Sequence, residues 1–236
     1  MPELKALCFD VFGTVVDWRS SLITHAQALG RRKGITADWE RLVDAWRAGY
    51  QPAMDRVRKG EVPWTNLDAL HRGTLDRLLA EHGISGLDEA DKVELNLGWH
   101  RLKGWPDSVP GLTRLKRKYI IATLSNGNVK LLVDMGKWAG LPWDTVLSAE
   151  LVHRYKPDPA TYRSAIEFLG DGEPGAVMMV AAHNGDLASA GSHGMQTAFV
   201  PRPSEYGPGQ MRDTRPEHDF TIVAADFEAL AERLGA

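Results

Sequence analysis

Four short polar motifs, each beside a predicted strand or helix, hold the side chains of this sequence that could do covalent chemistry. Asp10 ends the first apolar run and is followed at once by Val-Phe-Gly-Thr. Its carboxylate is a potential nucleophile, and Gly13 lets the next loop turn sharply enough to leave that carboxylate facing a crevice. The residues of the other motifs are Ser125 with Asn126, Lys156, and Asp186.

The elements that must position these side chains alternate between strand and helix patterns. Buried strands and the helices that follow them are predicted at 5–10, 119–124, 129–139, 160–169, 176–181, 186–194 and 197–200. This repeated order favours a parallel sheet with helices on its faces, an α/β Rossmann-like core. In such a sheet the ligand crevice lies beyond the carboxyl ends of the strands, so the distant motifs are expected to converge there.

The stretch after the first motif has a different pattern. Long helical periodicities occur at 20–30, 39–58 and 67–83, without a buried-strand run. This pattern predicts an all-helical cap inserted into the α/β core. The expected domains are a core formed by residues 1–16 and 100–236 and a helical cap formed by residues 17–99.

The four motifs, in this order and spacing over nearly the whole chain, resemble the haloacid dehalogenase superfamily. The resemblance implies the fold of that superfamily, with Asp10 as a covalent nucleophile. Its phosphohydrolases carry a second aspartate two residues after the nucleophile and an acidic pair for Mg²⁺. This chain has Phe12 and Ala182 at matching positions. Because a phosphoryl group needs its charge neutralised, these replacements argue against phosphoryl transfer.

The aromatic residue after the nucleophile and the missing metal carboxylate resemble the type II branch, the L-2-haloacid or (S)-2-haloacid dehalogenases. A halide leaves without a proton or a metal, so neither a metal ion nor another cofactor is expected. The resemblance implies that Asp10 attacks the halogen-bearing carbon from behind, forms an aspartyl ester and inverts the centre. Water then hydrolyses the ester, so that a small L-2-haloalkanoic acid gives a D-2-hydroxy acid.

The same resemblance implies roles for residues around the nucleophile. Arg47, in a Trp-Arg pair of the predicted cap, corresponds to an arginine that holds the departing halide. Ser125 corresponds to a serine that helps to hold the substrate carboxylate, and Asn126 to an amide near the halide. Lys156 corresponds to a lysine that keeps the nucleophile ionised and aimed. For Ser125 and Asn126 the alternative is an ordinary turn.

Five further residues complete the predicted site. Asp186 is expected to position or activate the hydrolytic water, and Phe12 to contact the substrate or the halide. Thr14 is expected to donate to the nucleophile or to the substrate carboxylate, or else to be only structural. Tyr162 matches a tyrosine of the family site, with helix packing as the alternative. Trp64 matches an aromatic residue of the halide pocket through a loose alignment.

One segment departs from the best-known dehalogenase pattern. Ala181, His183 and Gly185 stand where that pattern has a serine, an asparagine and a bulky aromatic residue. His183 could act as a general base near neutral pH, or it could be a neutral hydrogen-bonding spacer. Gly185 is expected to make room for the substrate unless another side chain fills the space.

Composition excludes several other classes. The 28 Lys and Arg residues against 31 Asp and Glu give a net charge of −3, without the basic excess that favours nucleic-acid binding. No apolar stretch approaches the roughly 18 residues of a membrane span.

Cys8 has no second cysteine to pair with, and no signal-peptide pattern is seen, so a reducing cytoplasm is expected. The expected partners are a small haloacid and, as is common in the family, a second copy of the chain in a homodimer.

Two other functions stay open at this point. One is a Mg²⁺-dependent phosphatase or phosphonatase with a rebuilt metal site, against which Phe12 and Ala182 argue. The other is a catalytically silent member that binds an acidic metabolite or a protein. A mere binder has no need of a nucleophile with a lysine partner, so Asp10 and Lys156 argue against it.

Overall fold

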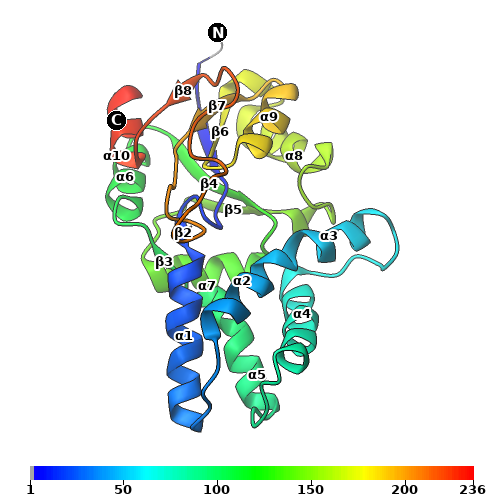
Figure 1. Ribbon diagram of the computed structural model, residues 1–236. Helices are drawn as coiled ribbons and strands as arrows, with labels where there is room; N and C mark the ends of the chain where they lie inside the picture. The colour runs from blue at the N-terminus through cyan, green and yellow to red at the C-terminus, as the bar shows by residue number, and fades with distance from the viewer. Residues whose placement is uncertain (1–2) are drawn as a thin grey trace.

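Six parallel strands form the central sheet of the computed structural model, which describes residues 3–236 (Figure 1). In spatial order they are β5 (Thr145–Ser148), β4 (Ile120–Ser125), β1 (Ala6–Phe9), β6 (Val177–Ala181), β7 (Gln196–Phe199) and β8 (Ile222–Val223). In the central β1, Leu7 pairs with Ile121 on one side and with Met178 on the other. Every residue of β1 is buried, which explains its uninterrupted apolar composition. The predicted α/β class with a parallel sheet is confirmed.

Helices cover both faces of this sheet. Because successive side chains of a strand point to opposite faces, β1 contributes to two separate cores. Leu7 and Phe9 belong to the core under α6 (Ser108–Leu115), α7 (Val129–Ala139) and α10 (Phe227–Arg233). Cys8 belongs to the core under α8 (Pro159–Gly170) and α9 (Asn184–Ser192). The sheet is therefore packed between two layers of helices.

A helical region is inserted between β1 and β4, and Figure 1 shows it gathered at one end of the sheet. Its elements are α1 (Trp18–Lys33), α2 (Trp39–Ala48), α3 (Tyr50–Arg58), α4 (Leu67–Glu81), α5 (Glu89–Asn96) and the 3-10 helix η1 (Leu97–Arg101). The antiparallel pair β2 (Val16–Asp17) and β3 (Lys103–Gly104) joins the points where the chain enters and leaves it. Within residues 3–236, no helix is both long and apolar enough to cross a membrane.

Short polar residues determine where the helices of this region begin. At the start of a helix a side-chain oxygen can accept a hydrogen bond from one of the unpaired backbone N–H groups. The side chains that do so, each accepting from the N–H three residues ahead, are Asp17, Asp38, Asn66 and Asp88.

The pattern at 39–58, predicted from the sequence as one helical stretch, is divided into α2 and α3 at Gly49. A Cβ atom on Gly49 would lie 2.6 Å from Cγ2 of Thr74 in α4, so glycine permits the close approach of these elements. Glycine also weakens a helix interior, which makes this a favourable place for a break.

The chain between β7 and β8 forms a long segment, residues 201–216, of turns and bends. In Figure 1 this segment, coloured orange, runs from β7 toward β2 before it returns to β8. It therefore passes close to the carboxyl ends of the central strands.

Candidate active site

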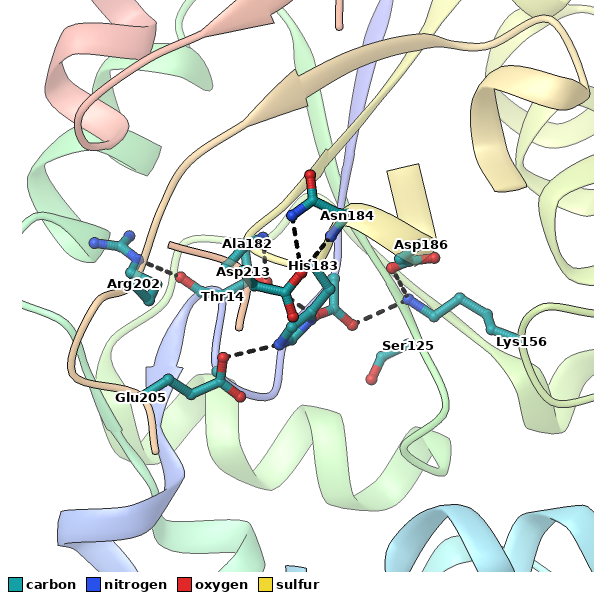
Figure 2. A network of polar contacts seen from close by, with 12 residues as sticks. Thr14, Ser125, Lys156, Ala182, His183, Asn184, Asp186, Arg202, Glu205 and Asp213 are labelled. Atoms are coloured by element: carbon teal, nitrogen blue, oxygen red, sulfur yellow. Dashed lines mark hydrogen bonds and ion pairs between the residues drawn. The ribbon is translucent and has the colours of Figure 1, made fainter. Parts of the chain in front are cut away.

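Asp10 lies directly after β1 and forms polar contacts with Thr14, Lys156 and His183, three of the residues labelled in Figure 2. One carboxylate oxygen, Oδ1, lies 3.0 Å from Nζ of Lys156. The other, Oδ2, accepts a hydrogen bond of 2.9 Å from Oγ1 of Thr14 and lies 3.0 Å from Nδ1 of His183. Asp10 is only 8% exposed, so its charge depends on these three donors rather than on water.

The surroundings keep both Asp10 and Lys156 charged. Burial would raise the pKa of Asp10, but Lys156 and then His183 outweigh it and hold that pKa well below its usual range. Burial would likewise lower the pKa of Lys156, and the carboxylates of Asp10 and Asp186 together raise it above its ordinary value. The result is an ionised, partly desolvated carboxylate, which is the form that can act as a nucleophile.

Lys156 is fixed in turn by groups from two other elements. Its Nζ lies 2.5 Å from Oδ2 of Asp186 at the start of α9, and its backbone N–H donates to Oδ1 of Asn126 at 2.8 Å. The hydroxyl of Tyr162 in α8 donates to Oδ1 of Asp186 at 2.7 Å. Both oxygens of Asp186 are thus engaged, by an ammonium group and by a phenol.

His183 lies between two carboxylates. Its Nδ1 faces Asp10, and its Nε2 lies 2.8 Å from Oε2 of Glu205. Both nitrogens must carry a proton to donate to both acids. Burial alone would lower the pKa of His183, whereas Glu205 and Asp10 raise it to about 10. The imidazolium form that follows at neutral pH argues against the neutral spacer considered from the sequence.

Glu205 belongs to this polar network, and sequence reasoning missed it. It comes from the 201–216 segment, and its side chain is 1% exposed. Its Oε1 accepts a hydrogen bond of 3.1 Å from Nε1 of Trp18. A Cβ atom on Gly13, whose φ is +88°, would lie 2.1 Å from the same oxygen, so only glycine leaves room for this acid. A glutamate in a Pro- and Gly-containing loop carries no local signal of such a position.

Two side chains anchor the 201–216 segment that delivers Glu205. Arg202 pairs with both oxygens of Asp107 at 2.8 Å, and its Nε donates to the backbone oxygen of Thr14 at 2.9 Å. Asn184 binds the far end of the segment, because its Nδ2 donates to Oδ1 of Asp213 at 3.0 Å. Glu205 therefore sits on a loop that is tied down on both sides.

Arg47 in α2 supplies a buried positive charge to the site. Its guanidinium lies over the ring of Tyr50, 4.4 Å from the centroid, and 5.4 Å from that of Trp18. Its Nε is buried and has no hydrogen-bond partner within the described chain, and its Nη2 lies 3.9 Å from Oε1 of Glu205. An unused donor on a permanently charged group is suited to binding an anion.

A cavity of about 820 Å³ opens onto these groups. The predicted site residues that line it are Asp10, Phe12, Arg47, Asn126, Lys156, Tyr162, His183 and Asp186. Thr14 and Ser125 are fully buried and lie behind its wall. Thr14 donates to the nucleophile as expected, whereas Oγ of Ser125 accepts from the N–H of Gly127 at 3.2 Å.

The placement of Trp64 at the halide pocket is wrong. Its ring packs against His153 and Tyr155, with centroids 5.1 and 4.7 Å away, and it does not line the cavity. Trp18 and Tyr50 supply aromatic wall there together with Phe12. The loose alignment through this part of the helical region is the reason for the error.

Among the side chains of residues 3–236, no three His, Cys, Asp or Glu residues are grouped so that they could hold a metal ion. Ala182 offers only its backbone N–H, which donates to Oγ1 of Thr14 at 2.9 Å.

The family model for haloacid dehalogenase-like hydrolases matches residues 4–194. The chain is 30% identical to (S)-2-haloacid dehalogenase 1 of Pseudomonas sp. strain CBS-3, over 87% of this chain and 89% of that protein.

Two solved structures are still more similar. One is an L-2-haloacid dehalogenase with 49% identity and a TM-score of 0.95, covering 98% of this chain and 99% of the other. The second is a defluorinating L-2-haloacid dehalogenase with 45% identity and a TM-score of 0.95, covering 99% and 96%. By the family match over most of its length and by these identities, this chain belongs to the haloacid dehalogenase-like hydrolases and, within them, to the L-2-haloacid dehalogenase family.

Proposed function

We propose that this protein hydrolyses L-2-haloalkanoic acids to D-2-hydroxy acids through an ester on Asp10. The observation that carries the proposal is the ionised Asp10 carboxylate at the cavity, held by Lys156 and followed two residues later by Phe12 rather than by an acid. Such a site can displace a leaving group that needs no proton, and a halide is one. The names of the relatives support the same substrate class.

In the first step an oxygen of Asp10 attacks the α-carbon on the side opposite the halogen. The new C–O bond forms with an electron pair of the carboxylate, and the C–halogen pair leaves with the halide, so the centre inverts. Arg47, with its unpartnered Nε, and Asn126 line the cavity and are suited to receive the halide. The charge that builds up on the leaving atom is then stabilised by donors that are already in place.

In the second step water attacks the acyl carbon of the Asp10 ester and the bond from that carbon to the alkoxy oxygen breaks. Once Asp10 is an ester, His183 has lost one of its two carboxylate partners, so its pKa falls and it can give up its proton. The neutral imidazole then takes a proton from the attacking water while Glu205 orients the ring. The imidazolium so formed protonates the departing alkoxide, and the proton of the new Asp10 carboxyl group restores the charged His183. Asp186 is the weaker candidate for this base, because Lys156 and Tyr162 already occupy its two oxygens.

The direct test is halide release from chloroacetate, fluoroacetate and the separate L and D isomers of 2-chloropropionate, in EDTA. We expect release from the L isomer with D-lactate as product, and none from the Asp10→Asn variant. Cleavage of p-nitrophenyl phosphate only after Mg²⁺ is added, without halide release, would replace the proposal by a phosphatase. If neither halide release nor cleavage of p-nitrophenyl phosphate is detected, a binding protein without catalytic activity would be favoured.

We infer three further properties from the family resemblance. Residues 17–99 form a cap domain on a core of residues 1–16 and 100–236, and the β2–β3 pair at the boundary supports this division. The chain forms a homodimer and works in a reducing cytoplasm, for which the single, fully buried Cys8 is suited. Limited proteolysis, light scattering of the purified protein and fractionation of the source cells test these properties in turn.

A further inference from the structure

The cavity is much larger than a two- or three-carbon acid requires. Its volume of about 820 Å³ lies in the upper part of the roughly 300–1,000 Å³ range of pockets that enclose drug-sized ligands. The catalytic groups occupy its buried part. The remaining, exposed wall is formed by Asp44, Ala48, Gln51, Pro157, Gly185 and Arg212.

Gly185 is an unusual member of this wall, because nothing in the structure requires a glycine there. It lies in the first turn of α9, and it is not among the residues with a positive φ. A Cβ atom added to it would meet no atom within 4 Å. Gly13 is the opposite case, since an added Cβ would collide with Glu205.

The space beside Gly185 continues along α9. Ser189 lies four residues later, on the same side of the helix, and also lines the cavity. Asp186, which holds Lys156, directly follows Gly185, so this open wall adjoins the reacting centre. Apolar surface for a hydrocarbon chain is available at Ala48, Pro157 and the ring of Tyr206.

We propose that Gly185 determines substrate size, and that the cavity accepts 2-haloalkanoic acids whose chain at the α-carbon extends several methylenes past Gly185 toward the opening. This inference rests on the proposed function, because it places the α-carbon at Asp10. Each methylene that leaves water strengthens binding by up to about fourfold. A large side chain built at position 185 removes that gain without touching Asp10, whereas the single methyl group of alanine does not.

The test compares wild type with Gly185→Ala, Gly185→Leu and Gly185→Phe on chloroacetate, L-2-bromobutanoate and L-2-bromohexanoate. We expect wild type to have a kcat/KM for the hexanoate at least equal to that for the butanoate. Gly185→Phe should lower kcat/KM for L-2-bromohexanoate about tenfold more than it lowers kcat/KM for chloroacetate. Gly185→Leu should show a smaller difference of the same kind. Gly185→Ala should keep the wild-type ratio, and thermal unfolding of each variant checks that it is folded.

Two results would overturn the inference: poor hydrolysis of the hexanoate by wild type, or an equal loss on all three substrates in Gly185→Phe. Binding of unhalogenated acetate and hexanoate, measured by calorimetry, separates this failure from failure of the proposed function. If hexanoate binds more tightly than acetate to wild type and this preference is lost in Gly185→Phe, the inference that Gly185 determines substrate size stands even without turnover. Equal affinities in wild type would reject it.

Discussion

Asp10 shares its two oxygens among an ammonium, an imidazolium and a hydroxyl group, and this sharing determines how it reacts. The donors keep the carboxylate charged inside the protein, where water would otherwise be needed to do so. They also hold both oxygens in place, Oδ1 by Lys156 and Oδ2 by Thr14 and His183. The reactivity of this residue is therefore a property of its neighbours, above all of Lys156.

Replacing Lys156 by Met should lower kcat/KM about 100-fold at neutral pH, because the carboxylate loses its main stabilising charge. Lys156 holds the pKa of Asp10 down, so its removal raises that pKa. The acidic limb of the pH profile of kcat/KM should then move to higher pH. The matched control is Lys130→Met, which removes an exposed lysine of α7. An unmoved acidic limb in Lys156→Met would contradict this account.

Replacing His183 by Asn should separate the two chemical steps. We expect the first turnover to release about one halide per site, because Asp10 and Lys156 remain, while steady-state turnover falls about 100-fold. The ester on Asp10 should accumulate and be seen as a mass increase of the intact protein. Asp10→Asn, the control, should show neither burst nor adduct. Full turnover without an adduct in His183→Asn would exclude the histidine as the base.

At the scale of elements, the 201–216 segment matters as much as any helix, since it brings Glu205 to His183. The strands that carry the motifs were predictable because fully buried strands are continuous apolar runs. β5 and α6 were not predicted, since each is short and lacks a long pattern. Glu205 could not be predicted, because its position depends on contacts of Arg202 with residues far away in the sequence.

The Arg202–Asp107 pair should therefore stabilise both the fold and the site. Both side chains are largely buried, so Arg202→Ala leaves Asp107 without its partner and should lower the free energy of unfolding by about 3–5 kcal/mol. Arg202→Lys keeps the charge but not the bidentate pairing, so it should retain part of the free energy of unfolding that Arg202→Ala loses. Denaturant unfolding measures both. A loss below about 1 kcal/mol in Arg202→Ala would show that the loop is held by other contacts.

At the scale of the whole molecule, the active site links folding to pH. The pKa of His183 is raised to about 10 in the folded protein, against an ordinary value of 6.5. A group with a raised folded pKa contributes stability that is complete below the ordinary value and is lost as pH rises through the folded one. Glu205 and Asp10, the two partners, come from opposite ends of the chain, so this contribution ties those ends together.

The free energy of unfolding should thus fall as pH rises from about 6.5 to about 10, and the fall should be smaller in His183→Asn. Urea unfolding at pH 7, 8.5 and 10 measures the difference between the two proteins. The matched control is His82→Asn, at the end of α4, outside the catalytic cavity. Parallel pH dependence in wild type and His183→Asn would show that the histidine carries no such linkage.

The place of β1 at the centre of the sheet has a consequence for synthesis on the ribosome. Ala6–Phe9 is made before both of its neighbours, which begin at Ile120 and Val177. At about 5–20 residues per second, roughly ten to thirty seconds pass before both are available. During that time this apolar segment has no partner strand, and an exposed apolar strand is a segment that chaperones can bind. A chain that stops before β6 would leave this segment half paired, so truncated products should be cleared rather than accumulate.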